Sequence, residues 1–146
     1  MRDNVQKALD FAIAKEVEAE SFYKTWAERS VEPAVRRLFA ELGAAEHDHA
    51  EMLRHVVPAD LLGRRGDGAD LGLSGILRDV KPSPSLTLQE ALLLAMKRED
   101  LSVRLYDRLA ELGGEPAALF RSLARVERAH KQRLEEAYDE NVLREN

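Results

Sequence analysis

Two copies of the spacing Glu-x-x-His carry the clearest chemical signal in the sequence. They pair Glu46 with His49 and Glu127 with His130. In a helix, residues three apart share a face, so the carboxylate and the imidazole of each pair can reach one ion. Carboxylate oxygen and imidazole nitrogen without thiolate suit iron, manganese or zinc. The two pairs therefore predict metal binding.

Two further glutamates, Glu16 and Glu99, interrupt apolar stripes in the same way. An unpaired carboxylate in an apolar core is costly enough to be neutralised or to unfold the protein. The stripes contain no lysine or arginine, because Lys15, Lys97 and Arg98 fall out of phase with them. Four glutamates balance two divalent cations, so we expect two ions in the middle of the core.

The other two histidines lack this spacing. The residue three before His47 is Ala44, and the residue three before His55 is Met52. We therefore interpret His47 and His55 as structural or exposed side chains rather than ligands.

Long helices are needed to position these residues. Alanine, leucine, glutamate and arginine dominate the sequence, and all four favour helix. The pattern predicts helices at about 3–29, 33–57, 88–112 and 116–143. Pro33 suits the first position of the second helix, and Thr87 with Glu90 forms a capping box before the third. The links within the first and the last pair are short, so each pair should form an antiparallel hairpin.

The stretch 58–86 separates the two hairpins. Five of the eight glycines lie between Gly63 and Gly75, and three of the five prolines are Pro58, Pro82 and Pro84. Such a composition breaks regular structure. We interpret 58–86 as a long crossover connection inside one domain that spans 1–146.

Each expected helix carries a stripe whose steps alternate between four and three residues, the period of a helix-bundle seam. The stripes are Val5, Leu9, Ala12, Glu16, Ala19, Tyr23 and Trp26; Val35, Phe39, Leu42, Glu46, His49, Leu53 and Val56; Leu88, Leu92, Ala95, Glu99, Ser102, Tyr106 and Leu109; and Pro116, Phe120, Leu123, Glu127, His130, Leu134 and Ala137. The first maps onto the third at an offset of 83, and the second onto the fourth at an offset of 81. The two halves should therefore be related by an approximate two-fold axis.

The polar positions should also lie at one height. The midpoint of Glu16 and Glu46 is Val31, and the midpoint of Glu99 and Glu127 is Gly113. Both midpoints fall in the expected turns, and residues equidistant from a hairpin turn lie level with each other. The spacing therefore predicts that all four glutamates meet in one layer.

Composition excludes several classes of function. The 146 residues carry a net charge of −5 and no cysteine. The arginines are scattered among carboxylates, so there is no basic face for nucleic acid. Without cysteine there is no thiolate zinc site, cysteine-ligated iron–sulfur centre or thiol catalysis. No apolar run approaches the length of a membrane span and no signal peptide pattern is present, so we expect no membrane partner and a cytoplasmic location.

The four stretches around these residues resemble the ferritin-like di-iron carboxylate proteins, and among them the rubrerythrins. They read AIAKEVEAESFY, LFAELGAAEHDHAEML, LAMKREDLSVRLY and LFRSLARVERAH. The resemblance covers all four helices but not the connection, and it implies an all-α, ferritin-like four-helix bundle. It implies that Glu46 and Glu127 bridge two iron ions and that Glu16 and Glu99 are terminal or bridging ligands. It also implies that His49 and His130 each bind one ion.

The same resemblance implies roles for Tyr23 and Tyr106, whose hydroxyls would hydrogen-bond the ligand carboxylates. Plain core tyrosines remain the alternative. Two features depart from the family. Rubrerythrins usually carry a rubredoxin domain with four cysteines, and they carry a further glutamate where this sequence has Ser102. The ligand set is therefore the six-residue set of ferritins, and the electron donor should be a separate protein or a small reductant.

The resemblance implies a di-iron oxidoreductase that acts on peroxide or dioxygen as a peroxidase or ferroxidase, in oxidative-stress defence or iron handling. Manganese or zinc could substitute for iron. Two alternatives remain: a non-catalytic protein that binds or delivers iron, and a metal-free helical scaffold. Because family members commonly pair, we expect a homodimer.

Overall fold

The computed structural model describes residues 2–62 and 86–143. Within these ranges the chain is entirely helical outside its turns. The long helices are α1 (Arg2–Arg29), α2 (Pro33–Arg54), α3 (Leu88–Glu111) and α4 (Ala117–Tyr138), with a 3-10 helix η1 (Pro58–Leu62) and a π-helical turn η2 (Asp139–Leu143). This architecture confirms the all-α fold class. No helix among the described residues combines the length and apolar character needed to cross a bilayer.

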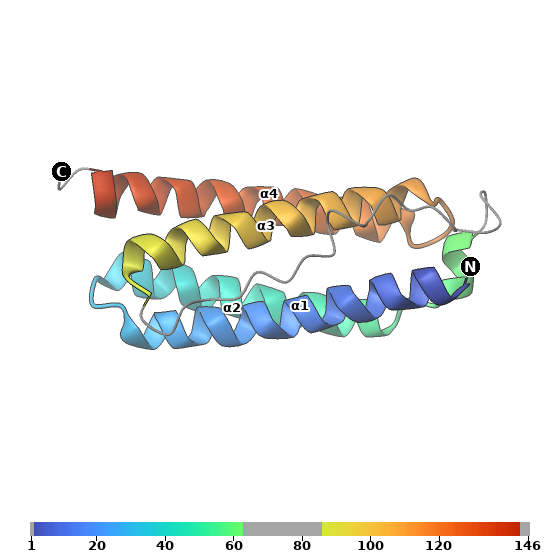
Figure 1. Ribbon diagram of the computed structural model, residues 1–146, viewed down its shortest axis with the longest axis horizontal. Helices are drawn as coiled ribbons and strands as arrows, with labels where there is room; N and C mark the ends of the chain where they lie inside the picture. The colour runs from blue at the N-terminus through green and yellow to red at the C-terminus, as the bar shows by residue number, and fades with distance from the viewer. Residues whose placement is uncertain (1, 63–85, 144–146) are drawn as a thin grey trace.

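The four helices form two antiparallel hairpins (Figure 1). Helix α1 packs mainly against α2, and α3 mainly against α4. Gly113 and Gly114 connect α3 to α4 with φ angles of 74° and 80°, a left-handed conformation that glycine adopts without strain. Both hairpins were expected from the short links, and the structure confirms them.

The predicted helix starts are also confirmed. At the start of α2, the backbone N–H of Val35 donates to the Glu32 side chain at 3.0 Å, and Pro33 occupies the first helical position. At the start of α3, the Glu90 N–H donates to the Thr87 hydroxyl at 3.1 Å, and the Thr87 N–H donates to the Glu90 carboxylate at 2.9 Å. These bonds satisfy backbone donors that a helix start leaves without partners.

Helix α2 ends at Arg54, three residues before the predicted end at Val57. Pro58 disfavours helical geometry at Val57, and before it the N–H groups of His55 and Val56 already bond the carbonyls three residues back, at Met52 and Leu53, so that the last turn is tightened. After the end of α2 the chain forms η1, which lies against α1. The rest of the predicted 58–86 crossover, except Leu86, lies outside the described residues.

Two apolar clusters fill the bundle, one toward each end. The first surrounds Leu9, Leu109 and Phe120, and the second surrounds Phe39, Leu92 and Leu134. Each cluster draws side chains from all four helices. The predicted polar layer lies between the two clusters. Each helix therefore carries its polar core residues in the middle and apolar core residues toward both ends.

Candidate metal centre

Six buried polar side chains meet in the middle of the bundle. They come from all four helices, and none of the six residues is more than 6% exposed as a whole. They are Glu16, Glu46, His49, Glu99, Glu127 and His130. We refer to these six residues as the Glu/His cluster. The structure therefore brings together every residue that the sequence predicted as a metal ligand.

The cluster divides into two overlapping sets of possible ligands. One set contains Glu16, Glu46, His49 and Glu127, and the other contains Glu46, Glu99, Glu127 and His130. Within each set, one potential ligand atom per residue lies within 4.8 Å of the others. Glu46 and Glu127 belong to both sets. The arrangement can hold two ions that share two carboxylates.

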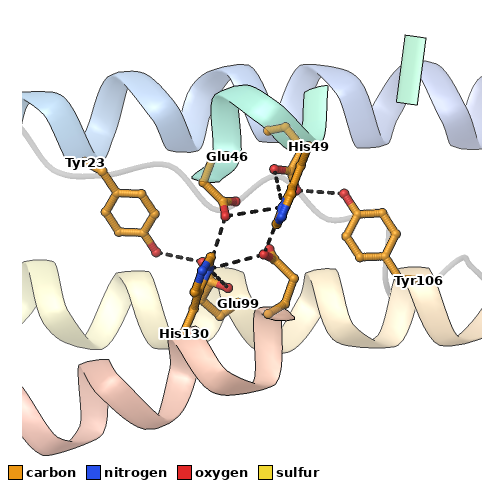
Figure 2. A network of polar contacts seen from close by, with 8 residues as sticks. Tyr23, Glu46, His49, Glu99, Tyr106 and His130 are labelled. Carbon is orange, nitrogen blue, oxygen red and sulfur yellow. Dashed lines mark hydrogen bonds and ion pairs between the residues drawn. The ribbon is translucent and has the colours of Figure 1, made fainter. Parts of the chain in front are cut away.

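The two imidazoles face these carboxylates through Nδ1 (Figure 2). The Nδ1 of His49 lies 3.2 Å from Glu127 Oε1 and 3.4 Å from Glu16 Oε2. The Nδ1 of His130 lies 3.2 Å from Glu46 Oε1 and 3.3 Å from Glu127 Oε1. The rings are nearly parallel, with centroids 6.1 Å apart. Each ring therefore presents a nitrogen to one of the two ligand sets.

Two tyrosines lie at opposite ends of the cluster (Figure 2). The Tyr23 hydroxyl on α1 donates to Glu99 Oε1 on α3 at 2.8 Å. The Tyr106 hydroxyl on α3 donates to Glu16 Oε1 on α1 at 2.7 Å. Each hairpin thus orients a glutamate of the other. The predicted hydrogen bonds to carboxylates are present. The role of the two tyrosines in orienting metal ligands stays a prediction.

Helix α2 lies close enough to α1 to hold Tyr23 in place. Gly43 on α2 faces Tyr23, and a Cβ at that position would lie 3.4 Å from Tyr23 Cβ, which is ordinary van der Waals contact. The Tyr23 ring also stacks on Phe39 of the same helix α2, with ring centroids 6.0 Å apart. Packing therefore fixes the ring from which the hydroxyl reaches Glu99.

The carboxylates repel one another strongly in this buried layer. Burial raises the pKa of Glu46 well above its ordinary value, and the charges of Glu127 and Glu99 raise it further. Burial likewise raises the pKa of Glu127, followed by the charges of Glu99 and Glu16. Low-dielectric surroundings disfavour each charge, and like charges nearby add to the penalty. The chain alone would hold protons here in place of cations.

The buried glutamate charges also shift the pKa values of the histidine and tyrosine side chains next to them. Burial by itself would lower the pKa of His130, but the nearby carboxylates of Glu46 and Glu99 outweigh it and raise the pKa to about 9. Burial, and then the adjacent glutamate charge, raise the pKa of Tyr23 and of Tyr106 well above the usual tyrosine value. Both hydroxyls therefore keep their protons and act as donors.

The cluster leaves polar atoms without partners. In the described part of the chain, seven buried side-chain atoms form no hydrogen bond, and all seven belong to the six cluster residues. Buried polar atoms are normally satisfied, so a group of orphaned atoms needs an explanation. Two protonated imidazoles could offset at most two of the four carboxylate charges. Oxygen and nitrogen ligands left unpaired around a shared centre fit a pair of bound cations.

The two histidines that the sequence set aside lie outside the cluster. His47 is exposed on α2, and its Nδ1 lies 3.2 Å from the carboxylate of Glu20 on α1. His55 is exposed and caps the end of α2. Neither side chain belongs to either candidate ligand set, which agrees with the prediction.

A comparison with protein-family models identifies residues 7–138 as a rubrerythrin domain. The chain belongs to the rubrerythrin family. The match covers all of the cluster and both tyrosines, which confirms the resemblance read from the four motifs. No curated protein matches the chain.

The chain is also similar to a solved structure from Thermotoga maritima, which is described as a putative ferritin-like diiron-carboxylate protein. It is 26% identical to this chain, with a TM-score of 0.67. The alignment covers 90% of this chain and 92% of the other. This similarity supports a ferritin-like bundle along nearly the whole chain.

The tyrosine hydrogen bonds should contribute to metal affinity. Tyr106→Phe removes the donor to Glu16, and Tyr23→Phe removes the donor to Glu99. Groups that orient a ligand typically contribute about 10- to 100-fold to metal affinity. We expect each variant to weaken binding by about 10-fold or more, measured by competition with a chromophoric chelator. As a control, Tyr138→Phe removes an exposed hydroxyl that pairs with Gln89, and it should leave affinity unchanged.

Proposed function

We propose that the chain is a di-iron oxidoreductase that reduces peroxide or dioxygen, or oxidises ferrous iron, at the Glu/His cluster. The observation that carries the proposal is the pair of ligand sets that share Glu46 and Glu127. Each set would hold one cation, and the shared carboxylates would keep the two cations close together. That arrangement suits a reaction that needs two electrons at one place.

Family membership favours iron over the manganese or zinc that the same ligands accept. With iron bound, hydrogen peroxide can take one electron from each of two ferrous ions and two protons from the surroundings, which yields two water molecules. The protein would supply the ligands that hold the two ions. Four glutamates neutralise the ions, and His49 and His130 each complete one ligand set.

Other side chains of the bundle hold the proposed ligands in position. Tyr23 and Tyr106 hold the outer glutamates by hydrogen bonds from the opposite hairpin. The apolar clusters on both sides limit access of bulk water, which strengthens every charge interaction in the layer. Ligand side chains that are held in this way need to move little when the charge of the ions changes.

Continued turnover needs electrons from outside the chain. The sequence contains no cysteine, so it offers no cysteine-ligated iron centre as a relay. We therefore propose that a separate protein or a small reductant reduces the iron pair. A homodimer also stays a prediction, which sedimentation or light scattering can test.

The proposal predicts a defined stoichiometry with peroxide. Anaerobic protein loaded with ferrous iron should consume about one hydrogen peroxide for every two ferrous ions, since each ion gives one electron. Mössbauer spectroscopy counts the ferric ions, and a peroxide assay gives the amount consumed. His49→Ala should abolish the rapid reaction, whereas exposed His47→Ala on the same helix should retain it.

The same experiment separates the competing functions. Ferrous protein that binds two ions per chain but stays inert toward peroxide and oxygen would indicate an iron-binding or iron-delivery protein. Protein that binds no metal would indicate a helical scaffold. Only rapid, stoichiometric oxidation is compatible with the oxidoreductase.

A further inference from the structure

The outer face of the α3–α4 hairpin carries an excess of positive charge. Helices α3 and α4 lie side by side along the bundle (Figure 1). Over residues 100–111 and 121–131, six cations and three carboxylates are exposed or half-buried. The cations are Arg104, Arg108, Arg121, Arg125, Arg128 and Lys131, and the carboxylates are Asp100, Asp107 and Glu111. We refer to the six cations as the basic face. It contrasts with the net charge of −5 on the whole chain.

Ion pairs between the two helices place these residues on one side of the bundle. The Arg128 guanidinium donates to the Asp107 carboxylate at 2.6 Å, and the Lys131 ammonium donates to Asp100 at 3.3 Å. The Arg104 guanidinium also lies 3.5 Å from Asp100. The carboxylates of this side are therefore already engaged by neighbouring cations.

Arg121 and Arg125 belong to the basic face but have no partner in it. They are exposed on α4, four residues and thus about one helical turn apart. Within the residues that the structure describes, neither side chain takes part in an ion pair or a hydrogen bond. A guanidinium can bind a carboxylate through two parallel hydrogen bonds. Both side chains are therefore available to carboxylates of another molecule.

The internal repeat shows that packing does not require these cations. Helices α1 and α2 form the same kind of hairpin as α3 and α4. At the offsets of 83 and 81, none of the six positions equivalent to the basic face carries lysine or arginine. The equivalent residues are Ser21, Thr25, Ala40, Ala44, His47 and Ala50. The cations are therefore a property of one half of the bundle, with a role other than folding.

The basic face lies over the Glu/His cluster. Arg128 directly follows Glu127 in the chain, and Lys131 directly follows His130. Glu127 and His130 are buried, whereas their neighbours are exposed or half-buried on the outer side of α4. A helix with its side chains is about 10–12 Å across. A molecule bound to the basic face would thus be separated from the proposed metal ligands by about one helix.

The size and pattern of the basic face favour an acidic protein as its partner. From Arg121 to Lys131 it extends about 15 Å along α4, which is more than a small anion can contact. The interspersed carboxylates would repel the continuous phosphate chain of a nucleic acid. Redox proteins typically associate through small interfaces, and complementary charges steer such encounters.

We propose that the basic face is the docking surface for an acidic redox protein that supplies electrons to the metal pair. Arg121 and Arg125 bind carboxylates of this donor, and the other four cations steer its approach. The inference rests on the proposed function, which needs an electron donor outside the chain. Each encounter oxidises the donor by one electron and reduces one ferric ion to ferrous, so two encounters reduce the pair.

Flavodoxin is a suitable probe, because it is an acidic protein whose reduced flavin gives up one electron at a time. Oxidised flavodoxin measures binding to the iron-loaded protein by calorimetry, and reduced flavodoxin measures electron transfer by anaerobic stopped-flow absorbance. Arg121→Ala/Arg125→Ala introduces the residues found at the equivalent positions Ala40 and Ala44, so the bundle should still fold. At low salt this variant should raise Kd about 10-fold, slow electron transfer to match and reduce the salt dependence of both.

Two controls separate docking from other effects. Arg36→Ala/Arg37→Ala removes the same amount of charge from exposed positions of α2 outside the basic face, and it should leave both measurements unchanged. Reduced methyl viologen is a small cationic donor that needs no acidic docking partner. It should reduce the iron of the Arg121→Ala/Arg125→Ala variant at least as fast as that of the wild type. Circular dichroism and metal content establish that each variant folds and is loaded.

Several outcomes would overturn the inference. Wild-type affinity and rate in the Arg121→Ala/Arg125→Ala variant would place docking elsewhere, and equal losses in the Arg36→Ala/Arg37→Ala control would assign the effect to net charge alone. Self-association that light scattering detects at low salt in the wild type but not in the Arg121→Ala/Arg125→Ala variant would assign the face to a second copy. Stronger binding of a short DNA duplex than of flavodoxin would assign it to nucleic acid.

The same measurements distinguish failure of this inference from failure of the proposed function. Protein that binds two iron ions and reacts with peroxide, but does not bind flavodoxin, would remove the docking surface and leave the proposed function intact. Protein that binds flavodoxin through Arg121 and Arg125 but binds no iron would keep the docking surface and remove the proposed function.

Discussion

Glu46→Gln and Glu127→Gln should each reduce the iron content from about two ions per chain to well below one. Each of these carboxylates belongs to both ligand sets, so one substitution weakens both ions. An amide has a single acceptor oxygen and no charge, so it cannot bridge two cations as a carboxylate does. By contrast, Glu16→Gln and Glu99→Gln each affect one set and should retain about one ion. Metal analysis after anaerobic reconstitution and desalting measures the difference.

Matched controls are available on the same helices. Glu51→Gln on α2 and Glu135→Gln on α4 change exposed carboxylates outside the cluster and should retain about two ions. Equal losses in all four cluster variants would contradict the assignment of bridging and terminal positions. Full metal content in the Glu46 and Glu127 variants would contradict the metal centre itself.

Removal of the metals should lower thermal stability strongly. A ligand that binds only the folded state adds about 4 kcal/mol when its free concentration is about 1,000 times Kd. Two ions would add about 8 kcal/mol on this basis, and for a chain of this size each kcal/mol shifts Tm by about 2–4 °C. We expect Tm to fall by roughly 20 °C in excess chelator. A Tm that is unaffected by chelator and by added iron would favour the metal-free scaffold.

The metal-free protein should also become less stable as pH rises. The pKa values of Glu46 and Glu127 are raised in the folded state from an ordinary value of 4.5, and that of His130 is raised from 6.5 to about 9. Above pH 4.5 the folded chain therefore binds more protons than the unfolded chain. Each extra proton lowers the free energy of unfolding by about 1.4 kcal/mol per pH unit. His130 contributes its full share below pH 6.5 and loses it as pH rises through about 9.

Urea unfolding of metal-free protein between about pH 5 and pH 9 measures this dependence. The free energy of unfolding should decrease steadily across the range. In metal-loaded protein the ions displace these protons, so the decrease should disappear or reverse. A metal-free protein whose stability rises with pH would show that the cluster carboxylates are already ionised and paired.

The fold could be predicted because local signals and the buried stripe agree. The capping box at Thr87, Pro33 at a helix start and the Gly113-Gly114 turn each mark an end that the structure confirms. The end of α2 was predicted three residues too late, since the apolar stripe continues to Val56 while Pro58 already disfavours helix. Periodicity reports which face is buried and is less informative about where hydrogen bonding stops.

The six cluster residues could also be found from sequence, because a charge on a core-facing stripe is rare. A small cavity beside them, between α1 and α3, could not. Lys15 and Arg98 are out of phase with the stripes, yet both, together with Glu46 and Glu99, line this cavity. Their equivalence at the offset of 83 was the available signal. A cavity depends on the volumes of side chains that face each other from two helices. The hydrophobic period of a single helix carries no information about those volumes.

The position of the Glu/His cluster between two separate apolar clusters has a consequence for cooperativity. Each apolar cluster joins all four helices at one end, and in the described part of the chain the Glu/His cluster lies between them with seven polar atoms that form no hydrogen bond. With ions bound, the two ends should melt as a single unit. Without ions, the repelling middle layer uncouples them, so calorimetry should show a broadened or two-step transition whose van't Hoff enthalpy falls below the calorimetric value.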